Sequence, residues 1–423
     1  MYQRSDRKNE RRIFTMNIPN KNELTRIYGE AEKSAARFQA VADHFAEIYH
    51  HDTAEFFTAP IIGNHTDHNG GRVIAGSIDM DTIGAAYPNN SSVIRITSEG
   101  YDKEVVVDIN DLASVPKAQG TVSLVAGMVE AIQKFGFKVA GFDAYVTTNV
   151  IRAAGVSSSA SFEMLVCSII NYFFNDGAMT YINYAKAGQY AENVYWLKAS
   201  GLMDQLACAV GGPILLDFSD RENPKYEKVN FSFHDYDHHL VIVNTGKGHA
   251  DLSEEYSEIP MEMKEAAKAA GAELLCETTL DKVLANMDKI DNDRAILRAI
   301  HFFKENERVE RAAKAVEEKD GETVLKLLSE SGKSSWELLQ NCYPIKAYTE
   351  QKISVALALT DLFLEKLGKG ICRIHGGGFA GVIMCVVPEE ETENYVSYIS
   401  EFAGKENVYP MNIRAVGAVH IEK

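Results

Sequence analysis

The chain has 423 residues, of which 46% are apolar and 24% are charged, and its formal net charge is -17. This length exceeds one ordinary hydrophobic core, so we expect two domains, and the composition is typical of soluble globular proteins. The negative charge argues against nucleic acid or an acidic membrane as a partner, because the field of the protein repels phosphate groups. Any anionic ligand therefore needs a local device, such as backbone N–H groups or a metal ion.

Cysteine usage and hydropathy indicate a cytoplasmic protein. The six cysteines are scattered and form no CxxC pair, which favours reduced, buried thiols. No apolar run approaches the roughly 20 residues needed to span a bilayer. Residues 1–15 are polar and basic and lack the apolar segment of a secretory signal. We expect them to be a disordered extension or a consequence of start-site choice, since Met16 opens a more regular segment.

Helical and strand-like patterns are mixed in both halves of the chain. In the first half they predict, in chain order, a helix at 22–51, strands at 55–63, 92–99 and 103–109, a helix at 121–137, a strand at 142–150, helices at 159–174 and 180–197, and a strand at 211–218. In the second half they predict a strand at 239–246, long helical stretches from about Pro260 to Leu367, and a strand at 381–387. The class is therefore α+β. The polar stretch 219–239 is the best candidate for a domain boundary.

The segment IIGNHTDHNGG, residues 61–71, crowds hydrogen-bonding side chains between glycines directly after an apolar run. A loop uses glycine and asparagine for its backbone, but it has no evident use for two histidines that flank an aspartate. This segment is therefore a candidate binding site at the end of a buried strand.

The segment AAGVSSSASFEML, residues 153–165, leads from small residues through three serines into a predicted helix. The start of a helix exposes unpaired N–H groups and the positive end of the macrodipole, which together favour anions. Small residues let a phosphate approach the backbone, and a serine hydroxyl can ligate Mg²⁺. The alternative is a serine cap on a buried helix. No GKS or GKT follows, so this is not a Walker sequence.

Two further segments carry groups that need partners. In IHGGGFAGVIM, residues 374–384, three consecutive glycines permit positive φ and a close backbone approach to a ligand, or form only a tight turn. Glu192 and Asp204 lie among apolar residues on either side of Gly201, and an unpaired buried charge is costly. Metal coordination would satisfy one carboxylate, and a substrate hydroxyl the other.

Four segments, IGNHTDHNGG, GVSSSAS, GLMDQ and GGGFAG, occur in this order between about Phe56 and about Val416. In these segments the chain resembles the GHMP small-molecule kinases and, within them, the galactokinases. The resemblance implies an α+β fold of two domains with the active site between them. Residues 16–218 would form a half like ribosomal protein S5 domain 2, and residues 238–423 an α/β ferredoxin-like half. It also implies ATP-dependent phosphorylation of a sugar, galactose first, at the anomeric hydroxyl, with Mg²⁺.

The resemblance also assigns roles to residues. Asp204 matches the catalytic aspartate near the anomeric hydroxyl, and Ser159 and Glu192 match the Mg²⁺ ligands. The implied sugar contacts are Asn64, His65, Asp67, Gly201 and Tyr256. The implied contacts to the ATP phosphates are Gly155, Ser157, Ser158, Ser159 and Ala160, together with Gly377 and Gly378 of the third motif.

The chain departs from the family pattern at several positions. The family has AP-G-R-x-x before its IG pair, whereas here Pro60 is followed at once by IIG, so the arginine is missing. That arginine usually lies beside the catalytic aspartate, and losing such a partner commonly lowers the rate by about 10²- to 10⁴-fold. Asn64 replaces an acidic residue, Ala153 and Ala154 replace glycines, and a Pro-Cys pair is lacking before GLMDQ.

These departures leave two alternatives to a galactokinase. One is a kinase-derived binding protein that senses sugar and ATP without catalysis, which the missing arginine motivates. The other is a kinase for another hexose or an amino sugar, since Asn64 alters the contact to the exocyclic hydroxyl. The sequence leaves both a monomer and a homodimer open.

Overall fold

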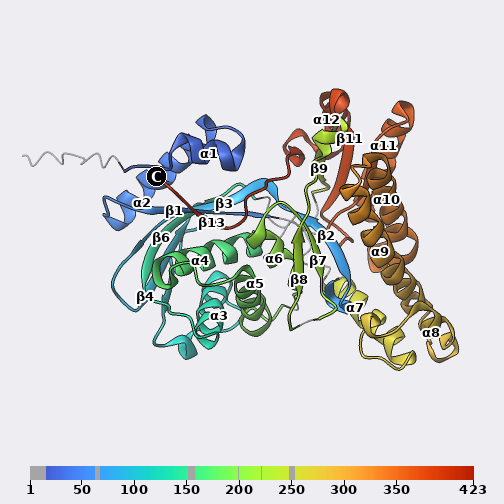
Figure 1. Ribbon diagram of the computed structural model, residues 1–423, viewed down its shortest axis with the longest axis horizontal. Coiled ribbons are helices and arrows are strands. Elements are labelled where there is room, and N and C mark those ends of the chain that lie inside the picture. Colours follow the sequence, from blue (N-terminus) through green and yellow to red (C-terminus); the bar gives the residue numbers. More distant parts are fainter. Residues whose placement is uncertain (1–15, 62–66, 151–157, 199, 221, 247–252) are drawn as a thin grey trace, which may run out of the picture.

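The computed structural model describes residues 16–61, 67–150, 158–198, 200–220, 222–246 and 253–423, with the backbone alone at positions 61, 67 and 253. Helices cover three sheets, and the two larger sheets lie in different halves of the molecule (Figure 1). Within the described residues, no helix combines the length and the apolar character needed to cross a membrane. The α+β class that the sequence predicts is confirmed.

The larger sheet of the first half has six strands in the order β13-β1-β3-β6-β4-β5. Its strands are β1 (Glu55–Ile61), β3 (Ile78–Pro88), β4 (Val93–Ser98), β5 (Val105–Asp108), β6 (Phe142–Thr148) and β13 (Val419–Ile421). Only the β4–β6 pair is parallel among these described strands. The end of the chain thus returns to the first half, where β13 pairs with β1.

Helices cover both faces of this sheet (Figure 1). One face packs on α3 (Thr121–Lys134), α4 (Ser158–Asn175), α5 (Tyr181–Tyr190) and α6 (Met203–Val210), and the other on α1 (Lys21–Tyr28) and α2 (Glu32–Tyr49). Successive side chains of a strand point to opposite faces. Phe56 therefore packs against α2 and Phe57 against α4, which explains why β1 is apolar without alternation.

The pattern at 22–51 predicts one helix, but the structure has two. Gly29 ends α1 in the left-handed conformation, with φ of 74°, and its N–H donates to Thr25 O. Glycine adopts this conformation without the steric penalty of a Cβ atom. The apolar spacing continues because Ile27 and Phe38 both face the same core.

The sheet of the second half has four antiparallel strands in the order β10-β11-β9-β12. They are β9 (His238–Asn244), β10 (Ile371–Ile374), β11 (Val382–Pro388) and β12 (Val408–Met411). Val241 and Val243 pack with α11 (Lys352–Leu367) and α12 (Thr392–Ala403), whereas Leu240 and Ile242 pack on the side of α10 (Gly321–Ser334). Further helices are α7 (Ser253–Ala269), α8 (Leu280–Leu284) and α9 (Asp293–Glu317).

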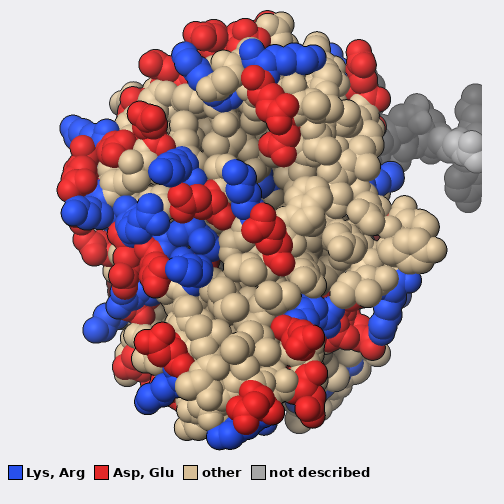
Figure 2. Space-filling view, turned by 90° about the vertical axis from the view of Figure 1, so that its right-hand side faces the viewer, with Lys and Arg blue, Asp and Glu red and all other residues tan. Residues whose placement is uncertain are grey.

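A three-stranded sheet joins the two halves. It consists of β2 (Arg72–Gly76), β7 (Pro213–Asp217) and β8 (Lys225–Lys228) in the order β2-β7-β8. The backbone N–H of Arg72 on β2 donates to Asn306 Oδ1 of α9 at 2.7 Å, and the Arg72 guanidinium donates to Asp217 on β7 at 2.9 Å. On the face that carries the helices of the second half, acidic and basic side chains are interspersed (Figure 2).

Candidate active site

Ser159 and Glu192 meet although 33 residues separate them in the chain. Ser159 lies in the first turn of α4, and its hydroxyl donates to Glu192 Oε1 at 2.7 Å. Glu192 lies on a π-helical turn, Ala191–Tyr195, that continues α5, and it is buried. Such a turn inserts an extra residue into a helix and is frequent at functional sites. The two predicted Mg²⁺ ligands therefore lie side by side.

Glu192 also contacts Lys198 and Gln205. The Lys198 ammonium lies 3.2 Å from the same oxygen, Oε1, and Gln205 Nε2 lies 3.5 Å from Oε2. Gln205 Nε2 also donates to Glu163 Oε2 at 3.2 Å, so one amide group connects two buried carboxyl groups. Burial, followed by the charge of Glu192, raises the pKa of Glu163 well above its usual range. Both causes favour the protonated form of Glu163.

Asp204 lies in the first turn of α6, next to Gln205, and is half-buried. Burial lowers the pKa of Lys198, but the charges of Glu192 and Asp204 raise it by more than burial lowers it. The pKa of Lys198 therefore lies above its ordinary value. The ammonium of Lys198 is thus held in the combined field of two carboxylates. Gly201 precedes α6, and the N–H of its neighbour Ser200 donates to Asn193 Oδ1 of the π-helical turn Ala191–Tyr195 at 2.8 Å.

The structure describes only part of the first motif. Asn64 and His65 lie outside the described residues, and of Asp67 only the backbone is described, at the start of the 3₁₀ turn Asp67–Asn69. His68 Nε2 lies 3.1 Å from the hydroxyl of Tyr256 on α7, and the two rings meet edge to face. The motif therefore lies against the helix that carries the predicted tyrosine, although His68 itself was not selected from the sequence.

The phosphate motif begins a helix as predicted. Gly155 and Ser157 lie outside the described residues, but α4 begins at Ser158, and Ser158 and Ser159 are half-buried. The side chain of Ala160 is buried in the core. Of the predicted phosphate contacts on α4, only the two serines thus present polar side chains near the helix start.

The third motif forms a turn after β10 that packs against Asn341. Gly378 has φ of 83°, and a Cβ atom there would lie 2.3 Å from Asn341 O. Asn341 Nδ2 donates to Gly377 O at 3.3 Å. The close backbone approach that glycine permits at Gly378 is therefore made to Asn341 of the same chain. The assignment of Gly377 and Gly378 to ATP stays a prediction.

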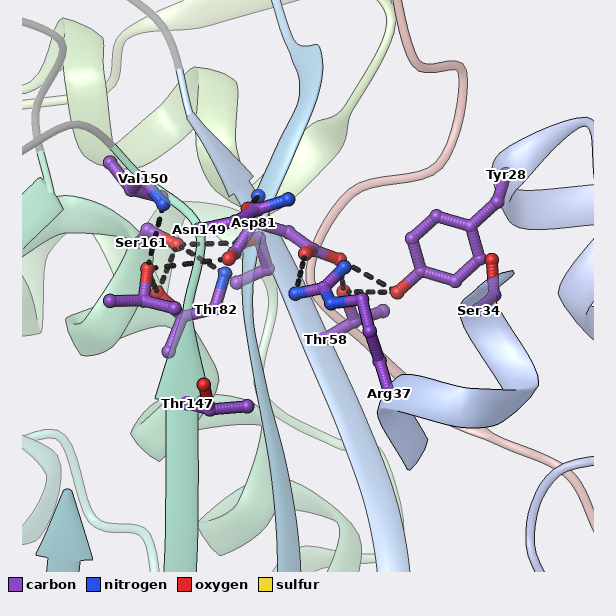
Figure 3. A network of polar contacts seen from close by, with 12 residues as sticks. Tyr28, Ser34, Arg37, Thr58, Asp81, Thr82, Thr147, Asn149, Val150 and Ser161 are labelled. Carbon is purple, nitrogen blue, oxygen red and sulfur yellow. Dashed lines mark hydrogen bonds and ion pairs between the residues drawn. The ribbon is translucent and has the colours of Figure 1, made fainter. Parts of the chain in front are cut away.

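A buried network around Asp81 supports the strand ends that lead into the first two motifs (Figure 3). Asp81 on β3 is paired with Arg37 at 2.9 Å and with Arg414 at 2.7 Å, and it accepts from Tyr28 at 2.6 Å and from Thr58 at 2.7 Å. Burial alone would raise the pKa of Asp81, but the two guanidinium groups and the hydroxyls lower it below its ordinary value. Asp81 therefore stays ionised inside the protein.

Ser161 extends this support to α4 (Figure 3). Its hydroxyl donates to Ala59 O on β1 at 2.6 Å and accepts from the N–H of Thr82 on β3 at 3.2 Å. The first turn of α4 is thus tied to the two strands beside it. Neither Asp81 nor Ser161 was predicted; the available signal was a carboxylate and a hydroxyl inside apolar runs.

The sheet has an irregular step at the end of β1. Pro60 pairs with Asp81 but Ile61 pairs with Ile78, so one step along β1 spans three residues of β3. The register thus changes directly after Pro60, the residue after which the sequence analysis expects the arginine segment of the family. Whether that segment is missing stays a prediction.

Comparison with known proteins identifies the family. The model of the GHMP kinases N terminal domain matches residues 123–212, and that of the galactokinase galactose-binding signature matches residues 43–88. A galactokinase of Limosilactobacillus reuteri is 30% identical over 366 residues, covering 83% of this chain and 90% of the relative. One of Lactiplantibacillus plantarum is 31% identical over 365 residues, with the same coverage.

Solved structures agree with these relatives. The structure of Lactococcus lactis galactokinase complexed with galactose has a TM-score of 0.75 and 25% identity, and the match covers 90% of this chain and 98% of that one. A mevalonate kinase of Methanococcus jannaschii, at 15% identity and a TM-score of 0.52, shares the fold over 85% of this chain and 98% of its own. This chain belongs to the galactokinase family of the GHMP kinases.

Proposed function

We propose that this protein transfers the γ-phosphoryl group of ATP to the anomeric hydroxyl of galactose. Kinship with galactokinases over most of the chain supports this reaction, and one similar structure contains galactose. The structural observation that carries the proposal is the meeting of Ser159 with Glu192, which also contacts Gln205, the neighbour of Asp204. A phosphate-binding helix start and a catalytic carboxylate are thereby connected.

Ser159 and Glu192 suit a magnesium ion, because hydroxyl and carboxylate oxygens are the ligands that Mg²⁺ prefers. The Lys198 ammonium, 3.2 Å from Glu192 Oε1, is a positive charge already accommodated beside this oxygen. When bound, Mg²⁺ would neutralise charge on the β- and γ-phosphates. The start of α4 would hold the phosphates through its N–H groups and the macrodipole.

Asp204 would orient the anomeric hydroxyl or accept its proton. We assign to Lys198 the positive charge that the family pattern places on its arginine, because Lys198 lies in the field of both Asp204 and Glu192. A cation there offsets charge that develops on the transferred group.

The sugar would lie beside the first motif, where Asn64, His65 and Asp67 are its proposed contacts together with Gly201 and Tyr256. The contact between His68 and Tyr256 supports this placement, because it brings the motif to α7. A site that hydrogen-bonds hydroxyl groups discriminates against sugars that lack them, by about 10⁴-fold in favourable cases.

A second candidate function is a catalytically impaired sensor of sugar and ATP. The irregular step between Pro60 and Ile61, where the family has its arginine, favours it. A third, phosphorylation of another hexose or an amino sugar, rests on Asn64 in place of an acidic residue.

An assay of ADP formation over a panel of sugars separates these candidates, with Asp204→Ala as the blank. Turnover that is fastest with galactose supports the proposal, and faster turnover with another sugar changes the acceptor. Thermal shifts with ATP and galactose but no turnover above the blank would identify a sensor. In that case, a Gly-Arg-x-x insert after Pro60 should restore activity.

A further inference from the structure

Two histidines and a glutamate gather at one end of the four-stranded sheet, outside the kinase site. His234 lies on the 3₁₀ turn Phe233–Tyr236, His239 lies on β9, and Glu389 follows β11. The antiparallel pairing of β9 with β11 brings these segments together. The N–H of Glu389 also donates to Asp237 O at 2.9 Å, which fixes the backbone of the glutamate.

The three side chains have the spacing of a metal site. One ligand atom from each lies within 4.8 Å of the other two, and His234 Nδ1 is 3.3 Å from Glu389 Oε1. A tetrahedral zinc site with bonds near 2.0–2.2 Å separates its ligand atoms by about 3.3–3.6 Å. The His234–Glu389 pair has this separation, and the ligand atom of His239 lies within 4.8 Å of both partners.

The neighbours of His234 determine which ring nitrogen is available. Asn412 Nδ2 donates to Asp79 Oδ2 at 3.2 Å, so Asn412 Oδ1 faces His234 Nε2 at 2.8 Å. This oxygen accepts the Nε2–H, which places the lone pair of the neutral ring on Nδ1. That lone pair and the Glu389 carboxylate are both acceptors, and they face each other. Such an arrangement needs a cation between them, either a proton or a metal ion.

We propose that His234, His239 and Glu389 bind a divalent transition metal ion of the Zn²⁺ class. Two imidazoles and one carboxylate form a ligand set that Zn²⁺ takes, with a fourth position for water, whereas Mg²⁺ prefers oxygen ligands alone. Asn412 acts as the outer partner that orients a ligating histidine. The side chains of His234 and Glu389 are 41% and 54% exposed, so the ion has access from solvent.

The site would connect the two halves of the molecule. The ion would join the 3₁₀ turn, β9 and the end of β11, all in the second half. Asn412 would extend this connection to Asp79 on β3, whose N–H also donates to Asn412 O at 3.0 Å. Zn²⁺ should therefore raise the thermal stability of the whole chain, independently of sugar and ATP.

The test uses the full chain without a polyhistidine tag, with Zn²⁺ titrated by calorimetry. We expect one Zn²⁺ per chain, no equivalent binding of Mg²⁺, and an increase in melting temperature. His234→Ala, His239→Ala and Glu389→Gln should each abolish this binding, and Asn412→Ala should weaken it about tenfold or more. His238→Ala is the matched control, because His238 is adjacent on β9 and bonds to Tyr236 O instead.

Co²⁺ in place of Zn²⁺ reports which atoms bind. We expect a tetrahedral visible spectrum that the three ligand variants lose, without a thiolate charge-transfer band. Absence of saturable Zn²⁺ binding would mean that a proton alone bridges His234 and Glu389, and the proposal would fail. It would also fail if the ligand variants bound Zn²⁺ like the wild type, or if a thiolate band placed the ion on the cysteines. A circular dichroism spectrum and an unfolding transition that both match those of the wild type in the presence of chelator confirm that the variants fold.

Discussion

The ammonium of Lys198 lies 3.2 Å from Glu192 Oε1, the same oxygen that accepts the hydroxyl of Ser159 at 2.7 Å. A metal ion held by Ser159 and Glu192 would neutralise the charge on this oxygen in place of Lys198. Lys198 would then be free to neutralise charge elsewhere, and Asp204 is already in its electrostatic range. Lys198 is thus placed to balance the charge of Glu192 without a bound ion and charge near Asp204 with one.

Replacing Lys198 by Met should therefore lower kcat roughly a hundredfold, the usual effect of losing one group that stabilises charge in the transition state. Lys198→Arg should retain most of the activity, since it keeps the charge. Steady-state kinetics at saturating Mg²⁺ and ATP measure the effect, and Lys103→Met, at an exposed position, is the control. A Lys198→Met enzyme with unchanged kcat would leave the missing arginine without a substitute.

Ser161→Ala should raise KM for ATP and destabilise the protein by about 1–3 kcal/mol, because the N–H of Thr82 and Ala59 O lose a buried partner. The start of α4 would no longer be tied to β1 and β3. Ser168→Ala is a matched control on the same helix, since its hydroxyl donates only to Leu165 O among the bonds described for it. Equal effects of the two changes on KM would contradict a positioning role for Ser161.

Asp81→Asn should cost about 3–5 kcal/mol of unfolding free energy, because it leaves Arg37 and Arg414 without their buried counter-charge. Chemical denaturation at neutral pH measures this loss, with the exposed Asp102→Asn as control. In combination with Arg37→Met the losses should not add, since both changes remove the same ion pair. Additive losses would show that the pair contributes little.

The pH dependence of the same residue has a defined sign. The pKa of Asp81 is lowered in the folded state, so its contribution is complete above the unfolded pKa of about 3.9 and is lost as pH falls through the folded pKa. Below about pH 4, the wild type should therefore lose stability faster than Asp81→Asn. Parallel acid-denaturation curves for the two proteins would contradict an ionised Asp81.

Local patterns in the sequence predicted the elements that carry the motifs, because helix and strand periods are local properties. The start of α4 in the triple serine, and the strand that ends at the first motif, are examples. Glu192 and Asp204 were selected because carboxylates among apolar residues need partners. The partner Lys198 was not found, since the π-turn that brings Glu192 toward it leaves no periodic signal.

Features that depend on distant contacts could not be predicted. The three-residue strand β13 exists because β1 offers it an edge more than 350 residues earlier in the chain. One of the two arginines that pair with the buried Asp81 is Arg414, which arrives from the far end of the sequence. The roles that the resemblance assigns to the site residues stay predictions, and Asn64, His65, Gly155 and Ser157 also lie outside the described part of the chain.

Glu163→Gln should make the protein more stable than the wild type as pH rises. Burial and Glu192 raise the pKa of Glu163, so above the unfolded pKa of about 4.3 the unfolded chain releases a proton that the folded protein keeps. Wild-type stability then falls with pH until the folded pKa is reached, whereas the neutral glutamine has no such term. Denaturation midpoints between about pH 5 and pH 8 measure the difference, with the exposed Glu390→Gln as control. A difference that does not change with pH would mean that Glu163 is ionised in the folded protein.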